Sequence, residues 1–259
     1  MRNVATIKLT GAVVKADARQ TARGVTALSL TVAGEYKSRD GSKSFPYYQR
    51  VDAYGKAADT IRGLAPVGTP VTVLGEVRQE RWEDRDGNKR SDVRVTAAFV
   101  APLAGEYPTV KDAKGQARLA GGQNIATILG NLTRDPDMRY TPNGAAVTNF
   151  SVAVNERRGE EEIVSYFEVV AWNDLAQQAA ELKKGQPVLI EGPIINETWT
   201  DKEGNKRYST RFEAFTIHAI RRPAGAGKTD DPNETRPDPN DLAPEELPAD
   251  EFPDEELPF

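Results

Sequence analysis

The most constraining feature of this 259-residue chain is that its sequence repeats itself. The offset between the two copies falls only from 121 or 122 residues near the N-terminus to 117 further on. Repeats of about 20 to 50 residues build solenoids, so a period near 120 predicts two whole domains of about 100 residues each in tandem. The corresponding segments are 3–7 and 124–128, 25–32 and 147–154, 48–54 and 166–172, 71–75 and 188–192, and 82–90 and 199–207.

The composition excludes several classes of protein. The chain contains no cysteine, which rules out disulfides and thiolate metal sites and fits a reducing compartment. Its N-terminal residues lack an apolar signal core, and no run approaches the roughly 18 to 20 apolar residues of a membrane span. We therefore expect a soluble, cytoplasmic protein.

Charge is distributed unevenly along the chain. Residues 230–259 contain twelve Asp and Glu and one Arg, so this segment has a net charge of −11 and the rest of the chain one of +6. A mildly basic body can attract a polyanion, whereas an acidic tail repels or imitates one. From residue 223 onwards the chain is rich in proline and acidic residues and almost without apolar ones, which predicts a disordered tail.

Each copy has the pattern of three strands, one helix and two strands. Residues 147–154 alternate in the manner of a half-buried strand, and Asp174 is a plausible N-cap for a helix over 175–182. Residues 56–64 occupy the helix position of the first copy. This order predicts an all-β chain with a minor helix, built as two tandem five-stranded OB-fold Greek-key barrels. We expect domains at 1–101 and 123–222, a flexible or loosely packed linker at 102–122, and the tail at 223–259.

The third strand of each copy has two different faces. Phe167, Val169 and Ala171 form an apolar face typical of a barrel core. The opposite face mixes aromatic and charged residues, a combination typical of single-strand nucleic-acid binding because every base has a face that can stack. The alternative is a covered apolar patch or a subunit contact. The second face carries Tyr48, Arg50, Asp52 and Tyr54 in the first copy, and Tyr166, Glu168, Val170 and Trp172 in the second.

The last hairpin of each copy supports nucleic-acid binding. Trp82 and Trp199 each precede a Gly-Asn turn that ends in a Lys-Arg pair, which brings a flat ring close to two cations. Stacking contributes about 1–3 kcal/mol per base, and cations add a salt-dependent attraction to phosphates. With Arg50, the predicted phosphate-binding cations are Lys89, Arg90, Arg134, Arg139, Arg157, Arg158, Lys206 and Arg207.

Three separated motifs resemble a known family. Residues 135–147 (DPDMRYTPNGAAV) followed by NFSVA at 149–153 resemble the first hairpin of bacterial single-stranded DNA-binding proteins. Residues 199–208 (WTDKEGNKRY) resemble the loop between their fourth and fifth strands. Residues 254–259 (DEELPF) resemble the acidic tip through which that family recruits repair and replication enzymes. Two OB domains on one chain are similar to the Deinococcus–Thermus type, in which a dimer replaces a tetramer of one-domain chains.

The resemblance implies a non-enzymatic protein without cofactor or metal. It would bind single-stranded DNA irrespective of sequence in replication, recombination and repair, as a nucleoid-associated homodimer. Tyr166, Trp172 and Trp199 match the family's base-stacking positions, as do Tyr48, Tyr54 and Trp82 in the first copy. The partner-binding tip would consist of Asp254, Glu255, Glu256, Leu257, Pro258 and Phe259.

The first copy departs from the family pattern. It has ADARQTARG at residues 16–24 in place of the second copy's DPDMRYTPNG, and Asp52 where the second copy has Val170. An acid on the DNA face would repel phosphate, so we expect the first copy to bind more weakly. Two alternatives stay open, an RNA-binding OB protein and an interaction scaffold in which at least one barrel does not bind nucleic acid.

Overall fold

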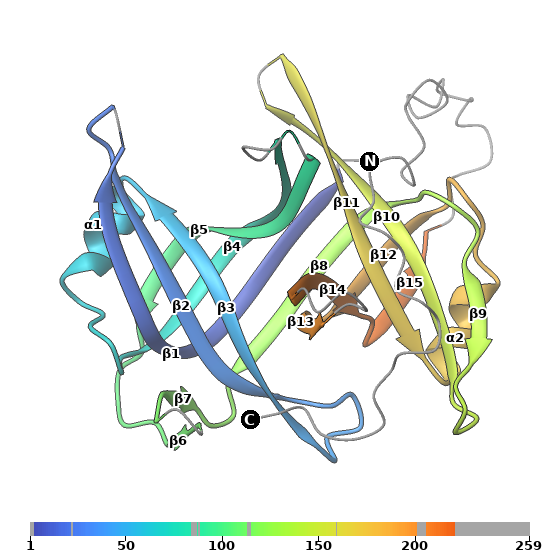
Figure 1. Cartoon of the computed structure of the whole chain (residues 1–259), viewed down its shortest axis with the longest axis horizontal. Helices are drawn as coiled ribbons and strands as arrows, with labels where there is room; N and C mark the ends of the chain where they lie inside the picture. The colour runs from blue at the N-terminus through green and yellow to red at the C-terminus, as the bar shows by residue number, and fades with distance from the viewer. Residues whose placement is uncertain are drawn as a thin grey trace.

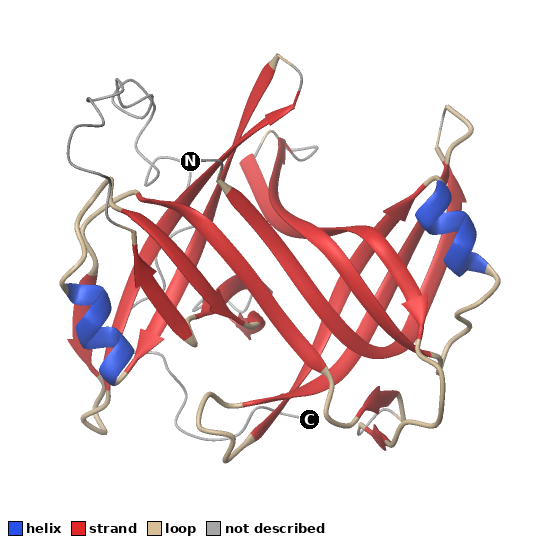
Figure 2. Cartoon of the chain, turned by 180° about the vertical axis from the view of Figure 1, so that it is seen from behind, coloured by secondary structure: helices blue, strands red, loops and turns tan. Residues whose placement is uncertain are grey.

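The computed structural model describes residues 3–21, 23–83, 87, 89–112, 115–158, 160–200 and 206–220. Strands dominate, and two short helices lie at the opposite outer ends of the molecule (Figures 1 and 2). They are α1 (Lys56–Arg62) and α2 (Asp174–Ala180), and neither helix of the described part has the length to cross a membrane. Each lies between the third and fourth strands of its repeat.

The first repeat forms a closed five-stranded barrel, as its element order predicts. The first strand pairs with the second and the fourth, and the barrel closes where the third strand meets the fifth in parallel at Val51 and Val95. Its strands are β1 (Val4–Gln20), β2 (Thr26–Lys37), β3 (Ser44–Tyr54), β4 (Pro70–Glu83) and β5 (Lys89–Pro102).

The second repeat has the same topology with three of its strands interrupted: the first is divided into β8 and β9, and the last two are also broken. A break at Pro193 divides the fourth strand, and a break at Ala214 and Phe215 divides the fifth. The barrel closes through a parallel pairing of Val169 with Phe212, the counterpart of the closure in the first repeat. Its strands are β8 (Gln123–Leu132), β9 (Asp137–Tyr140), β10 (Ala146–Arg158), β11 (Glu161–Trp172), β12 (Pro187–Gly192), β13 (Ile194–Thr200), β14 (Lys206–Glu213) and β15 (Thr216–Ala219).

A glycine in the first strand of each repeat permits close contact with the next strand. A Cβ on Gly11 would lie 2.6 Å from the carbonyl oxygen of Ala33, and one on Gly130 would collide with the carbonyl oxygen of Ala153. Such contacts exclude any side chain, which explains why glycine is needed at a barrel bend.

The two barrels share one continuous sheet. β1 and β8 pair antiparallel from Val4 and Leu129 to Thr10 and Gln123, and they run side by side through the middle of the molecule (Figures 1 and 2). The shared sheet has the order β5-β4-β1-β8-β12-β15. The pairing fixes one barrel relative to the other through backbone hydrogen bonds.

The barrel core agrees with the predicted alternation, but the helix start does not. Phe167, Val169 and Ala171 are fully buried. The helix begins at Asp174, and its N-cap is Asn173 with a φ of 53° and no capping side-chain hydrogen bond. The prediction of Asp174 as N-cap is therefore wrong, and its carboxylate instead accepts a hydrogen bond from Arg39 of the first barrel, with Nη1 and Oδ1 2.6 Å apart.

The linker between the barrels contains an ordered hairpin, so the prediction of a flexible or loosely packed linker is wrong there. The hairpin, which we call the linker hairpin, consists of β6 (Thr109–Lys111) and β7 (Ala117–Leu119) and lies beside the first barrel (Figure 1). Leu119 is buried, and Arg118 forms an ion pair with Glu35 on β2 at 2.9 Å. One buried apolar side chain and one largely buried ion pair hold the hairpin in place.

Candidate nucleic-acid interface

The outer faces of β3 and β11 carry aromatic residues, as predicted. Tyr54 is 42% exposed, while Tyr48, Tyr166 and Trp172 are half-buried. Asp52 and Val170, on the same faces, are buried, because the parallel contacts with β5 and β14 that close the barrels lie at these positions.

Asp52 does not present an open negative charge. Its carboxylate lies 3.6 Å from Nε of Arg50 and 3.9 Å from Nη1 of Arg94, at 5% exposure. The two guanidinium groups offset its charge. The expectation that Asp52 faces DNA and repels phosphate is therefore wrong, and this part of the case for weaker binding by the first copy falls away.

Several predicted cations contact carboxylates. Arg134 lies 3.9 Å from Glu168, and Arg139 forms a 2.8 Å pair with Asp137. These pairs are at least one-third exposed, and exposed ion pairs contribute little, so a phosphate can replace the carboxylate at small cost. Arg157 is exposed near the end of β10.

The last hairpin of each barrel, β4–β5 in the first and β13–β14 in the second, places a tryptophan opposite an arginine. In the backbone register Trp82 faces Arg90, and Trp199 faces Arg207. The Trp82 side chain is 44% exposed, and the guanidinium carbon of Arg94 lies 5.9 Å from its ring centre. The side chains of Lys89, Arg90, Arg158, Trp199, Lys206 and Arg207 lie outside the described part, as do the predicted tail and its tip at 254–259.

β4 of the first barrel contacts β11 of the second. The backbone N–H of Gln79 donates to Oγ of Ser165 at 3.1 Å, and the backbone N–H of Tyr166 donates to Oε1 of Gln79 at 3.3 Å. The Arg81 guanidinium covers the Tyr166 ring at 5.0 Å from its centre. Arg81 was not predicted from the sequence; its position next to Trp82 in an aromatic, basic segment was the available signal.

Tyr48, the counterpart of Tyr166 in the first barrel, has a different neighbour. Its hydroxyl donates to Oδ2 of Asp112, between the strands of the linker hairpin, at 2.7 Å. Burial and this carboxylate raise the pKa of Tyr48, while a hydrogen bond from Arg118 acts in the opposite direction. The two equivalent tyrosines thus lie in different chemical environments.

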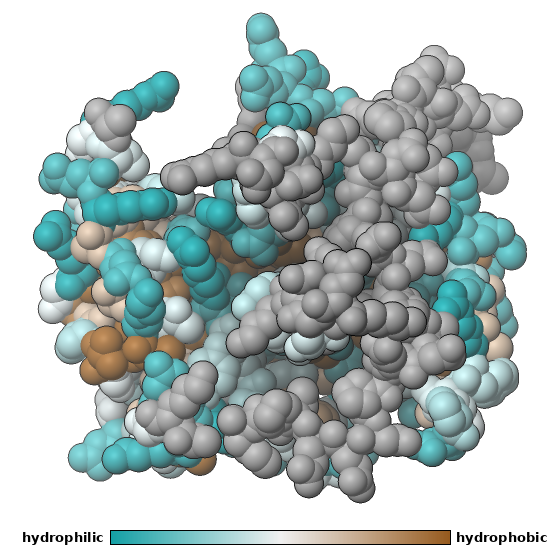
Figure 3. Space-filling view, viewed as in Figure 1, coloured by the Kyte–Doolittle hydropathy of each residue, from teal (hydrophilic) through white to brown (hydrophobic). Residues whose placement is uncertain are grey.

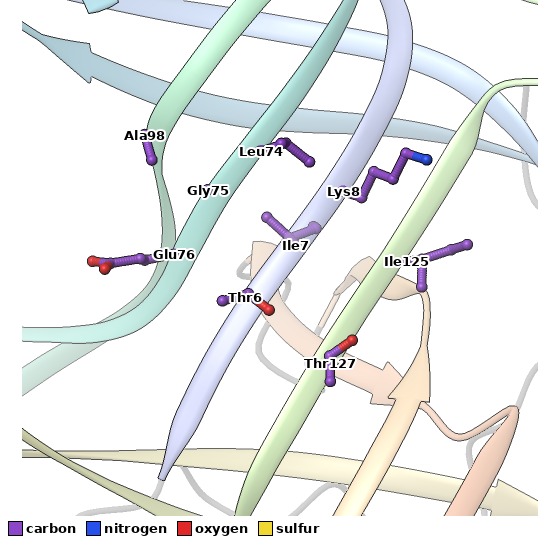
Figure 4. A pocket seen from close by; sticks show the side chains of 9 residues that line it. All are labelled: Thr6, Ile7, Lys8, Leu74, Gly75, Glu76, Ala98, Ile125 and Thr127. Atoms are coloured by element: carbon purple, nitrogen blue, oxygen red, sulfur yellow. The ribbon is translucent and has the colours of Figure 1, made fainter. Parts of the chain in front are cut away.

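A second surface lies on the outer face of the shared sheet. Phe99, Leu74, Lys8 and Ile125 are in register across four adjacent strands, and the three apolar members are each at least 43% exposed. Beside this row, which we call the apolar row, lies an open hollow of about 450 Å³ (Figure 4).

In the view of Figure 3, hydrophilic side chains predominate on the outside of the first barrel, with hydrophobic ones between them.

The described residues contain no group of three or more His, Cys, Asp or Glu side chains arranged to hold a metal ion. The face described above offers aromatic rings and guanidinium groups for recognition. Its rings lie on the outside of both barrels, next to arginines.

Comparison with known proteins gives a consistent result. The model of the Single-strand binding protein family matches residues 4–103 and again residues 123–220. The chain is 41% identical to a single-stranded DNA-binding protein of Thermus aquaticus over 94% of this chain and 93% of that protein. It is 43% identical to one of Deinococcus radiodurans, over 80% and 72%. The crystal structure of the wild-type Thermus aquaticus protein superposes with a TM-score of 0.69 at 35% identity, covering 88% of this chain and 98% of the other. The chain belongs to the Single-strand binding protein family.

Proposed function

We propose that this chain binds single-stranded DNA irrespective of sequence, by stacking bases on its outer aromatic side chains and holding phosphates with nearby arginines. The observation that carries this proposal is that an outer ring of each barrel lies beside a guanidinium group, Trp82 beside Arg94 and Tyr166 beside Arg81. Stacking does not discriminate strongly among bases, because each has an aromatic face.

Duplex DNA should bind poorly to the same surface. Its bases are stacked on one another and reach an outer ring only after the strands separate, which costs free energy. The proposed role is therefore to protect and organise exposed single strands during replication, recombination and repair. No chemical step is part of it.

The apolar row supports a homodimer. Phe99, Leu74 and Ile125 are exposed apolar side chains in one row across a broad sheet, interrupted only by Lys8, and such patches commonly mark protein interfaces. A second copy of the chain presents an identical row and can pair with it about a twofold axis. Four barrels in one dimer would then be available to the strand.

We further propose that the acidic C-terminal segment recruits other proteins. Leu257, Pro258 and Phe259 follow Asp254, Glu255 and Glu256, so an apolar end with a terminal carboxylate lies next to three acids. A partner with an apolar pocket bordered by Arg or Lys could bind both parts.

Tryptophan fluorescence tests the main proposal. The full-length protein is titrated with oligo(dT), with oligo(rU) and with a duplex of equal length, at low and moderate salt. Strong quenching by oligo(dT), weak quenching by the duplex and weaker binding of oligo(rU) support it. Equal responses to oligo(dT) and oligo(rU) would favour the RNA-binding alternative, and no quenching would favour the interaction scaffold.

A further inference from the structure

The two barrels contact each other at two places that correspond in the repeat, and the residues at the two places differ. With the offset of 117 residues, Gln79 and Arg81 on β4 correspond to Asn196 and Thr198 on β13. At the first junction β4 meets β11 at Tyr166; at the second, β13 meets β3 at Tyr48. We call them the Tyr166 junction and the Tyr48 junction.

At both junctions an amide side chain at the equivalent repeat position hydrogen-bonds the backbone of the tyrosine. Gln79 binds Ser165 and the backbone of Tyr166, and Asn196 donates through Nδ2 to the carbonyl oxygen of Tyr48 at 3.3 Å and to Oε1 of Gln49 at 3.1 Å. The repeat therefore conserves the contact between the barrels at both places. The side chains around the two tyrosine rings differ.

At the Tyr166 junction, a cation lies on the ring. The Arg81 guanidinium is 5.0 Å from the Tyr166 ring centre and donates to Oε1 of Gln79 through Nη2 at 2.7 Å. Among the described residues, no acidic side chain pairs with Arg81, in contrast to Arg78 and Arg94 on the same sheet. A positive charge fixed next to a stacking ring is suited to neutralise the phosphate beside a stacked base.

At the Tyr48 junction, an anion lies on the tyrosine hydroxyl. Oδ2 of Asp112 in the linker hairpin accepts a hydrogen bond from the Tyr48 hydroxyl at 2.7 Å, and Thr198 stands where the Tyr166 junction has Arg81. The hairpin is anchored by the Arg118–Glu35 pair and by buried Leu119. The linker exists only once in the chain, so only one of the two tyrosines can be held in this way.

We propose that a single strand passes from one barrel to the other at the Tyr166 junction, through Arg81, and that the linker hairpin keeps Tyr48 from taking part at the other. A phosphate at the Tyr48 junction meets the Asp112 carboxylate, and the guanidinium group there, Arg118, is already paired with Glu35, which disfavours the phosphate electrostatically. This inference rests on the proposed binding of single-stranded DNA, and it assigns the route that the DNA strand takes from one barrel to the other.

Matched substitutions at the two junctions test this path. Binding of oligo(dT) of roughly 30 nucleotides, near the upper limit for two OB domains, is measured by tryptophan quenching over a range of salt concentrations. Tyr166→Ala should weaken binding by roughly 5- to 150-fold, the effect of losing one stacked base, and Tyr48→Ala by less than about twofold. Tyr166→Leu and Tyr48→Leu, which keep apolar volume, repeat the comparison if an alanine variant unfolds.

Two further variants test the charges. Arg81→Thr installs the residue of the opposite junction and should reduce the slope of log affinity against log salt by about 0.7, the value for one lost phosphate contact on a single strand. Asp112→Asn should tighten binding, and this gain should vanish in the Tyr48→Ala background. Thermal unfolding without DNA verifies that each variant is folded.

The outcomes separate the two proposals. If the wild-type protein does not bind oligo(dT), the proposed function fails. If the wild type binds but Tyr48→Ala and Tyr166→Ala weaken binding equally, or Arg81→Thr leaves the salt slope unchanged, only the assigned path is overturned.

Discussion

Arg78 of the first barrel and Glu156 of the second form an ion pair with Nε and Oε2 2.9 Å apart. Their side chains are 15% and 17% exposed, so both are largely removed from water. Arg78 also binds Glu76 on its own strand at 2.5 Å. One guanidinium thus links two barrels that already share a sheet.

Removing one partner of this pair should destabilise the protein. Glu156→Gln is expected to lower the free energy of unfolding by about 1.5–3 kcal/mol, the range for hydrogen bonds to charged groups, because Arg78 keeps its buried charge. Chemical denaturation measures the change. Asp174→Asn, which removes the exposed pair with Arg39, is the control and should have little effect. Equal losses for both variants would refute the importance of burial.

Glu213 should make stability depend on pH. Burial raises its pKa in the folded protein above the usual 4.5. The folded state then binds this proton more tightly than the unfolded state, so stability falls as pH rises from 4.5 through the raised pKa. Glu213→Gln should therefore match the wild type near pH 4 and have a higher Tm at pH 7. A Tm difference that is constant with pH would contradict this origin.

The apolar row should control association. Phe99→Glu would place a buried, unpaired charge in the proposed dimer interface and should yield monomers at micromolar concentration. Light scattering after size exclusion reads the mass against the 28.3 kDa of one chain. Leu64→Glu, at a similarly exposed leucine after α1, should leave the mass unchanged. A dimer that survives Phe99→Glu would place its interface elsewhere.

The two tryptophan hairpins should contribute unequally. Given the divergent segment 16–24, we expect Trp82→Ala to weaken oligo(dT) binding less than Trp199→Ala, with an upper value of about 3 kcal/mol per lost stack. Equilibrium titration compares the two single variants with the wild type. Equal losses would count against a weaker first barrel.

Glycine at the barrel bend should be indispensable. Gly11→Ala places a Cβ against the carbonyl oxygen of Ala33 and should cost about 1–3 kcal/mol of stability, as overpacking does. Gly63→Ala has no atom within 4 Å of the new Cβ and an ordinary φ of −96°, so it should be neutral or slightly stabilising. Thermal unfolding ranks the two variants, and a reversed order would contradict the packing argument.

The order of elements and the core were predictable because they depend on local patterns. The alternation at Phe167, Val169 and Ala171 and the helix positions after the third strands follow from side-chain periodicity alone. The pairing of β1 with β8 was not predictable, because alternation specifies which face is buried and not which strand forms the next hydrogen bonds.

The parts of the site that were missed depend on contacts distant in sequence. Arg81 acquires its role from Tyr166 in the other barrel, and Asp52 is covered when the barrel closes. Leu119 is the only buried residue among the described members of the linker hairpin, so the segment has no apolar period to detect. For the C-terminal tail and for the side chains of the hairpin turns, such as Trp199 and Arg207, the predicted roles rest on the sequence alone.

The pairing of β1 with β8 joins two barrels of one covalent chain, and this has a genetic consequence. In an assembly of identical one-barrel chains, a single codon change alters every barrel at once. Here each barrel of the joined pair has its own coding segment, so selection can modify one and spare the other. Dilution cannot separate the pair either, since a covalent connection replaces a binding equilibrium. Tyr48 lies beside Asp112 and Tyr166 beside Arg81. A symmetric oligomer of identical one-barrel chains could not encode this difference.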